Sequence, residues 1–198
     1  MQLDSNVKTL LDTLANSGQP KLWDLTPPDA RQMVRLFSEM LEGKEPTGAI
    51  EHRSLPGPAG PVASRLYVPV GASAVAGDSA GGNLAAVVCQ MAREQGLRVA
   101  LQILLCPVTD IAADNQSRHL FAEGYFLEAP LMRWAGMQYL PPGVDSNDSR
   151  LSPLRAADLS GLPPAHIHTA GFRPPAGRRE RIRRRSRAGW RGNTLRVS

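Results

Sequence analysis

The chain has few cysteines and no long apolar run, and each shortage excludes a class of protein. Its 198 residues include only Cys89 and Cys106, too few for a disulfide framework and without the spacing of a metal site. No apolar run is long enough to cross a membrane, and the first residues lack the basic and apolar stretches of a secretory signal. We therefore expect a cytoplasmic protein that binds neither a metal nor a membrane.

Acidic side chains are scarce in one part of the chain, residues 173–198. This segment holds ten Arg and one Glu, a net charge of +9, so the rest carries −4 of the whole chain's +5. Such a run could bind phosphates without sequence preference. With Pro174-Pro175 and no apolar face, it is also typical of a disordered end. We favour a folded domain over residues 1–172 and a disordered basic tail that recognises no specific nucleic acid; weak anion binding is the alternative.

Glycine is concentrated around one serine. Residues 77–82 read Gly-Asp-Ser-Ala-Gly-Gly, which places Ser79 between Gly77 and Gly81. This spacing is typical of the sharp strand-to-helix turn that presents a nucleophilic hydroxyl. A Cβ at either glycine is expected to collide with the neighbouring strand or helix. We therefore interpret Ser79 as a nucleophile; a structural turn at the start of a helix is the alternative.

The flanking residues predict the strand and the helix that such a turn needs. Residues 74–76 are a short apolar stub, the expected end of a buried strand. Beyond the turn, apolar and polar residues separate at helical spacing, and Gly96 is a stop signal. The apolar face comprises Leu84, Val87, Val88 and Met91, and the opposite face Gln90, Arg93 and Glu94.

Residues 77–86, Gly-Asp-Ser-Ala-Gly-Gly-Asn-Leu-Ala-Ala, closely resemble the nucleophile motif of the hormone-sensitive-lipase-like bacterial esterases, a branch of the α/β-hydrolases. The resemblance continues through residues 101–110, 152–154 and 162–172. It implies an α/β fold with a mostly parallel sheet and a helical lid that includes residues 1–45. It also implies a carboxylic ester hydrolase that acts on a small-molecule ester without cofactor or metal.

The resemblance gives each residue of the motif a role. An acyl group would be transferred to Ser79 and then hydrolysed, with the backbone amide of Ala80 as an oxyanion donor. The residues that would support the turn are Gly77, Asp78, Gly81 and Gly82. Oligomeric state, natural substrate and acyl length do not follow from the sequence.

The chain departs from the family pattern in two places. It has no His-Gly-Gly-Gly run, which in the family supplies most of the oxyanion hole, and residues 65–69 lead almost directly into the turn. Two strand–helix units are therefore missing from the centre of the sheet, about 60 residues, since one unit needs about 30. After Phe172, Arg173-Pro174-Pro175 stands where the family has its triad aspartate, and the last strand is also missing.

A change of reading frame accounts for the second departure. Read one base later, codons from Arg173 onward permit Asp-Pro-Leu-Arg-Asp, the segment that the family has at this point. We therefore hypothesise that residues 173–198 are a frameshifted tail, a hypothesis that the coding DNA decides.

The four histidines are not placed to complete a triad. His166 and His168 share a face of a predicted strand, and the other two are expected in a hairpin and a polar connection; these are His52 and His119. Asp110 and Asp114 lie near a strand end without a partnered histidine. Because loss of the base costs a serine hydrolase about a million-fold in turnover, we expect an inactive or nearly inactive enzyme. A non-catalytic remnant or binding module is the alternative.

Periodicity predicts the remaining elements. Amphipathic helices are expected over residues 5–15 and from Thr26 to Gly43, with Thr26 as N-cap. Their buried faces would comprise Val7, Leu10, Leu11 and Leu14, and Met33, Val34, Phe37, Met40 and Leu41. A β-hairpin is expected over residues 50–55 and 62–68, buried strands over 99–105 and 165–170, and a second lid segment over 121–139 that contains Tyr125, Phe126 and Trp134.

Overall fold

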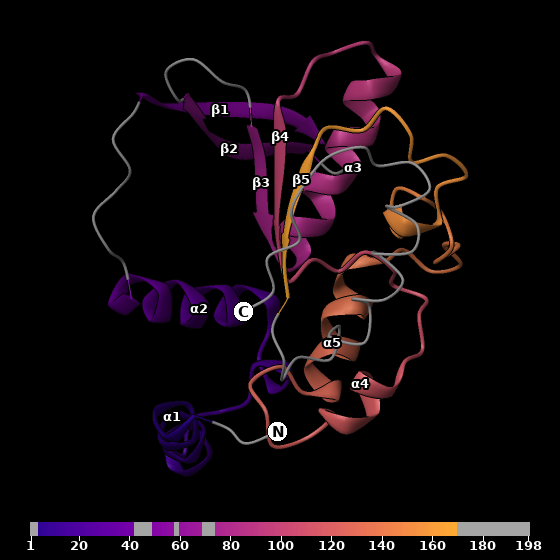
Figure 1. Ribbon diagram of the computed structural model, residues 1–198. Coiled ribbons are helices and arrows are strands. Elements are labelled where there is room, and N and C mark those ends of the chain that lie inside the picture. The colour runs from indigo at the N-terminus through magenta and orange to yellow at the C-terminus, as the bar shows by residue number, and fades with distance from the viewer. Residues whose placement is uncertain (1–3, 42–48, 58–59, 69–73, 170–198) are drawn as a thin grey trace.

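Figure 1 shows the computed structural model, which describes residues 4–41, 49–57, 60–68 and 74–169. The helices are α1 (Ser5–Asn16), η1 (Leu22–Asp24), α2 (Pro27–Leu41), α3 (Ala80–Glu94), α4 (Gln116–Leu120), α5 (Ala129–Tyr139) and η2 (Pro153–Arg155). The strands are β1 (Ala49–Gly57), β2 (Gly60–Val68), β3 (Ala74–Asp78), β4 (Leu101–Leu105) and β5 (Ala165–His168). None of these helices is long and apolar enough to cross a membrane.

The strands form two separate sheets. β1 and β2 make an antiparallel hairpin that runs from the pair Ala49–Val68 to the pair Gly57–Gly60, which confirms the predicted hairpin. β3, β4 and β5 make a parallel sheet in that order. With three strands in the parallel sheet of the described residues, the prediction of an incomplete α/β-hydrolase-type sheet is confirmed.

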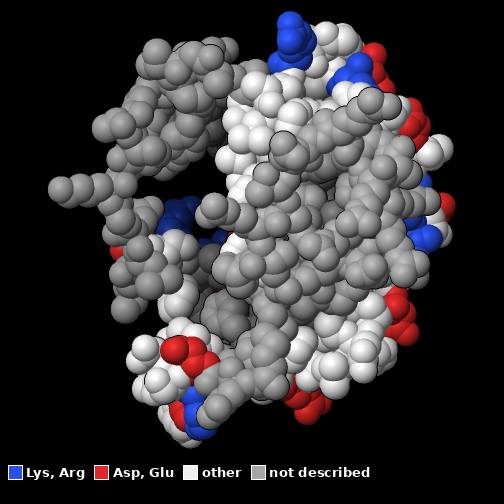
Figure 2. All heavy atoms as spheres, in the orientation of Figure 1, with Lys and Arg blue, Asp and Glu red and all other residues white. Residues whose placement is uncertain are grey.

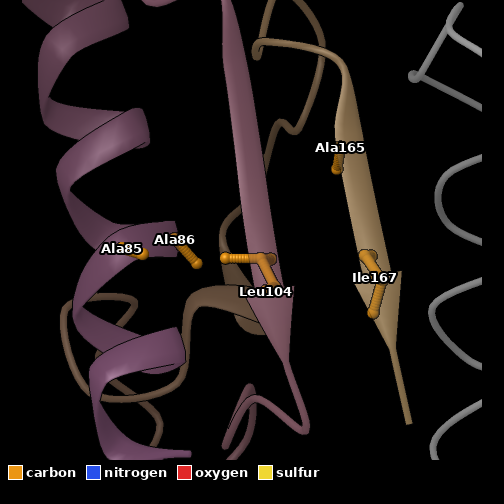
Figure 3. Close-up of a cluster of buried hydrophobic side chains, with 5 residues drawn as sticks. All are labelled: Ala85, Ala86, Leu104, Ala165 and Ile167. Carbon is orange, nitrogen blue, oxygen red and sulfur yellow. The ribbon is translucent and has the colours of Figure 1, made fainter. Parts of the chain in front are cut away.

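Helix α3 covers one face of the parallel sheet. The apolar core there joins Ala85 and Ala86 of α3 to Leu104 of β4 and to Ala165 and Ile167 of β5. In Figure 3, Leu104 points across the interface toward the two alanines. Three of the five residues are alanine, so the helix and the sheet approach each other closely.

The other face of the sheet is less covered. Ala74, Ala76 and Asp78 of β3 are exposed, as is Leu105 of β4, with 41% of its surface accessible, and Ile103 is half-buried. The prediction of a strand buried on both faces over residues 99–105 is therefore wrong: the strand begins at Leu101, and only Gln102 and Leu104 are buried. Parallel sheets are normally covered on both faces. Among the described residues, a helix packs closely on only one face of this sheet.

The predicted packing face of α3 is right at Val87, which is buried, and wrong at its other three residues. Leu84, Val88 and Met91 are exposed, whereas Gln90 is buried. The residues that face the protein interior are mostly small: Gly82, Asn83, Ala85, Ala86, Val87, Cys89, Gln90 and Ala92. Small residues let the helix lie directly against the sheet as it leaves the turn, so the bulkier apolar side chains project outward.

Helices α1 and α2 begin as predicted. Asp4 caps α1, and at the start of α2 the Asp29 amide donates to Thr26 Oγ1 while the Thr26 hydroxyl donates to the Asp29 carboxylate. Their expected apolar faces are largely open, since α1 has no buried residue and Val34 of α2 is exposed. The part of the second prediction that concerns Met40, Leu41 and Gly43 lies outside the described side chains.

The two predicted lid segments meet at a pair of rings. Phe37 of α2 stacks on Phe126, which precedes α5, with ring centroids 6.3 Å apart. In Figure 1 the carboxyl ends of β3, β4 and β5 point toward the end of the molecule where α2, α4 and α5 lie. Helix α4 was not predicted, because its five residues are too few to show helical periodicity. The lid role of residues 1–45 stays a prediction.

Candidate active site

Ser79 lies in the turn between β3 and α3. Its backbone has φ 56° and ψ −114°, a conformation that residues with a Cβ rarely adopt. β3 ends at Asp78 and α3 begins at Ala80, so one residue makes the whole turn from strand to helix. The predicted strand–turn–helix is confirmed. Although Ser79 occupies the N-cap position, its hydroxyl does not cap the helix.

Two of the glycines near Ser79 are required by close backbone approach. A Cβ on Gly77 would lie 2.1 Å from the carbonyl oxygen of Gly81, and one on Gly82 would lie 2.9 Å from Pro107 Cβ. A Cβ on Gly81 would meet nothing within 4 Å. The expected collision is therefore confirmed at Gly77 and wrong at Gly81. The Gly81 backbone is what a Cβ on Gly77 would meet, but a Cβ on Gly81 itself would have room.

Backbone hydrogen bonds hold the Ser79 turn against the next strand. The Ser79 amide donates to the carbonyl oxygen of Leu105 (2.8 Å), and the Ser79 carbonyl accepts from the amides of Asn83 and Val108 (3.1 Å each). One of these donors belongs to α3 and the other to the loop after β4. The turn is thus held from both its own helix and the neighbouring strand end.

The first amides of α3 lie directly after Ser79. A helix of 15 residues begins at Ala80, and the first amides of any helix have no partner within it. They and the helix dipole favour negative charge at this end. An oxygen that gains negative charge beside Ser79 would therefore be stabilised by the start of α3.

None of the four histidines lies in the Ser79 turn, and two of them, His166 and His168, are two residues apart on β5. His52 lies on β1 and is exposed, and His166 and His168 lie on β5. Asp78 of β3 pairs with Leu105 of β4, and Leu105 pairs with His168 of β5. Two strand spacings of about 4.8 Å therefore separate the Cα atoms of Asp78 and His168, about 10 Å in all.

His119 has a carboxylate partner that the sequence analysis missed. Its Nε2 lies 2.7 Å from Asp114 Oδ1, and the two side chains are 71% and 80% exposed. The second aspartate considered, Asp110, is buried and pairs with Arg155 at 3.0 Å. The only sequence signal for the His119 pair was its five-residue spacing across the start of α4.

Both cysteines are free thiols. Cys89 is fully buried in α3, and burial raises the pKa of its thiol to about 11. Cys106 follows β4 and has φ 43°. Among the described residues no group of three or more His, Cys, Asp or Glu side chains could hold a metal ion.

The charged side chains of the described surface are mixed in sign. On the face drawn in Figure 2, Lys and Arg alternate with Asp and Glu around the rim instead of gathering in one patch. The Arg-rich segment 173–198, on which the prediction of a disordered basic tail depends, lies outside the described residues.

Comparison with known proteins identifies the family. A family profile described as alpha/beta hydrolase fold matches residues 52–197, most of the chain. The chain therefore belongs to the alpha/beta hydrolase fold family. The predicted resemblance to the α/β-hydrolases is confirmed, and the similar proteins carry the names of ester hydrolases.

The first of these relatives is a carboxylic ester hydrolase, LipN of Mycobacterium tuberculosis, which is 51% identical over 110 residues (52% of this chain and 29% of that protein). The second, an ethyl acetate hydrolase of Pseudomonas putida, is 38% identical over 94 residues (46% and 30%). This chain thus matches less than a third of the length of these curated relatives.

A solved structure agrees with the described fold. This is the structure of the ester hydrolase EH1AB1, from the metagenome of Lake Arreo, in complex with a derivative of bipyridine phosphonate. It is 27% identical, with a TM-score of 0.84, and the match covers 99% of this chain and 89% of that one.

Proposed function

We propose that this chain is a carboxylic ester hydrolase by descent, with Ser79 as its nucleophile. The observation that carries the proposal is the positive φ of Ser79 between β3 and α3 in a member of this family. The Ser79 hydroxyl would attack the ester carbonyl, release the alcohol and form an acyl-enzyme. Water would then hydrolyse that intermediate and free the acid.

The amide of Ala80 is the proposed oxyanion donor. It is the first residue of α3 and follows Ser79 directly, the place from which a nucleophile turn supplies one amide to the developing charge. Gly77 and Gly82 support the turn because no Cβ fits at either position. Asp78, at the end of β3, and Gly81, whose backbone contacts Gly77, complete it.

We further propose that the chain is inactive or nearly inactive in turnover. The sequence has no His-Gly-Gly-Gly run to supply the other oxyanion amides. Each missing oxyanion donor costs about a hundred-fold or more in rate. In sheet register the histidine nearest the turn is His168 of β5, whose Cα lies about 10 Å from that of Asp78. No histidine of the described strands therefore lies on β4, the neighbour of β3, where a base could directly adjoin the Ser79 turn.

The proposed substrate is a small ester of a carboxylic acid. Support comes from the names of the relatives, a carboxylic ester hydrolase and an ethyl acetate hydrolase. The phosphonate complex of the similar structure suggests a probe, since an activated phosphonate mimics the tetrahedral intermediate of ester hydrolysis.

Hydrolysis of p-nitrophenyl acetate by the purified 198-residue chain tests the proposal. The parent chain is compared with Ser79→Ala and with Ser54→Ala, an exposed serine of β1. We expect slow release of p-nitrophenol that Ser79→Ala abolishes and Ser54→Ala leaves unchanged. Prolonged incubation with a fluorophosphonate should add one phosphonyl group, located at Ser79 by mass spectrometry. Equal rates for the parent and Ser79→Ala, with no labelled serine, would refute the proposal.

A non-catalytic binding module is the second candidate. The ten Arg of residues 173–198 favour it, since a basic segment binds anions without chemistry. The discriminating measurement is binding to a short single-stranded oligonucleotide at rising salt. Weak binding that a moderate rise in salt abolishes, by a chain that shows no Ser79-dependent hydrolysis, supports this second candidate.

A further inference from the structure

Three segments that are distant in sequence meet at the side chain of Asn83. Asn83 lies in the first turns of α3 and is 5% exposed. Its amide nitrogen donates to the carbonyl oxygen of Val108 (2.5 Å) and to that of Leu151 (2.8 Å). The side chain therefore joins the helix after Ser79 to the loop after β4 and to the segment before η2.

The chemistry of these contacts defines the orientation of the amide. Both partners are carbonyl oxygens, which only accept hydrogen bonds, and the Asn83 amide nitrogen carries two hydrogens to donate. An aspartate at this position would bring a carboxylate against two carbonyl oxygens. An apolar side chain would leave the carbonyls of two half-buried residues without these donors.

One of the residues that Asn83 holds also holds Ser79. The amide of Val108 donates to the Ser79 carbonyl oxygen, while the Val108 carbonyl accepts from the Asn83 side chain. Val108 thus connects the two residues through opposite ends of its own backbone. The Ser79 carbonyl accepts a second bond from the Asn83 backbone amide, so both of these donors depend on Asn83 or on the loop that Asn83 fixes.

These hydrogen bonds hold the backbone of Ser79, which is strained. A non-glycine residue at φ 56° is strained and keeps that conformation only where its surroundings over-determine it. We propose that Asn83 is the positioning residue of the Ser79 turn: its side-chain amide fixes the loop at Val108, and that loop keeps the Ser79 backbone at positive φ. The effect on reactivity rests on the proposed function of Ser79, whereas the effect on the loop does not.

Gln90 provides a matched control. It lies on the same helix, is also buried, and also donates its side-chain amide to the segment around η2, at the carbonyl oxygen of Pro153 (2.9 Å). No bond from Gln90 reaches the loop at Val108 among those that the structure gives. Gln90→Met and Asn83→Leu each replace a buried amide with an apolar side chain of similar size, but only the second removes the contact with Val108.

The test combines two measurements on the full chain. Amide hydrogen exchange at Val108, followed by NMR, reports the loop, and the rate of fluorophosphonate labelling at Ser79 reports the nucleophile. We expect Asn83→Leu to speed exchange at Val108 about tenfold, as loss of the bonds that order the loop implies. It should slow labelling by a similar factor, while Gln90→Met changes both rates less than about twofold. Thermal unfolding of each variant shows whether general destabilisation differs between them.

Each outcome decides a separate point. Equal acceleration at Val108 in both variants, or in neither, overturns the positioning role of Asn83. Faster exchange at Val108 with unchanged labelling also overturns it, because the loop would then not control Ser79. If the parent chain is never labelled at Ser79, the proposed function falls, and exchange at Val108 still decides whether Asn83 fixes the loop. If Asn83→Leu does not fold, Asn83→Ser, which keeps a smaller donor, takes its place in both measurements.

Discussion

Ser79 and Cys106 follow neighbouring parallel strands, and they are the two described residues other than glycine with positive φ, at 56° and 43°. The amide of Ser79 donates to Leu105, the residue just before Cys106. The Cys106 amide in turn donates to the carbonyl oxygen of His168 at the end of β5 (2.7 Å). Unusual backbone conformation therefore occurs at adjacent strand ends, on the edge of the sheet where ligands bind in open α/β folds.

The two glycines beside Ser79 should differ sharply in their tolerance of a methyl group. We expect Gly77→Ala to destabilise the protein by more than about 3 kcal/mol, because its Cβ would lie 2.1 Å from the Gly81 carbonyl oxygen. Gly81→Ala, with open space around the new Cβ, should cost less than about 1 kcal/mol. Urea unfolding measures both, and similar losses for the two variants would contradict the described turn.

The ion pair of Asp110 with Arg155 should matter more to stability than a surface pair. Asp110 is 2% exposed, so Arg155→Leu leaves a buried carboxylate with less compensation, which should cost about 3 kcal/mol. Arg150→Leu is the control, since it breaks a bidentate contact with Asp148 at the surface and should cost less than about 1 kcal/mol.

Chemical denaturation of both arginine variants provides the measurement. The double variant Asp110→Asn with Arg155→Leu should recover part of the loss, because it removes the buried charge as well. If Arg150→Leu proves the more damaging of the two, the buried pair does not contribute as its burial suggests.

The two thiols should react differently in the folded protein. Cys106 is half-buried, whereas Cys89 is fully buried and its pKa is raised from 9.0 to about 11. Because the thiolate is the reactive form, iodoacetamide at pH 8 should modify Cys106 and leave Cys89 intact until denaturant is added. Peptide mass mapping identifies the site, and rapid native alkylation of Cys89 would count against its burial.

The same raised pKa predicts a stability change at high pH. The folded state keeps its proton on Cys89 to a higher pH than the unfolded state does, so the free energy of unfolding should fall between pH 9 and about 11. Cys89→Ala should weaken this dependence. Denaturation curves at pH 8 and pH 10 for the parent and Cys89→Ala test the sign.

The less covered face of the parallel sheet should bind a hydrophobic dye. Leu105 is 41% exposed on this face, whereas Leu104, its neighbour on β4, is 2% exposed against α3. We expect Leu105→Ser to lower the fluorescence of anilinonaphthalene sulfonate with little loss of stability. Leu104→Ser should instead destabilise the core by about 3 kcal/mol or more. Dye fluorescence unchanged by Leu105→Ser would show that the dye binds elsewhere.

The sequence by itself determined the local structure around Ser79. Ser79 has a glycine two residues away on each side, an apolar stub before it and helical spacing after it. This pattern predicts a strand and a helix joined by a tight turn, and few other arrangements fit it. The β1–β2 hairpin, the cap at Thr26 and the end of α3 near Gly96 were predictable for the same reason. Each depends on residues close together in the chain.

Only the tertiary structure decided which faces are buried. Of the four residues whose apolar spacing predicted a packed face, only Val87 is buried, and α3 turns mostly small residues to the sheet. A Cβ added to Gly82 would lie only 2.9 Å from Pro107 Cβ, so the start of α3 lies very close to the loop after β4. Bulky side chains on that face of the helix do not fit there. The contacts of Asn83 and the pairing of Asp110 with Arg155 join segments more than twenty residues apart. Spacing along one helix contains no information about such partners, because they are brought together only when the sheet and its loops assemble.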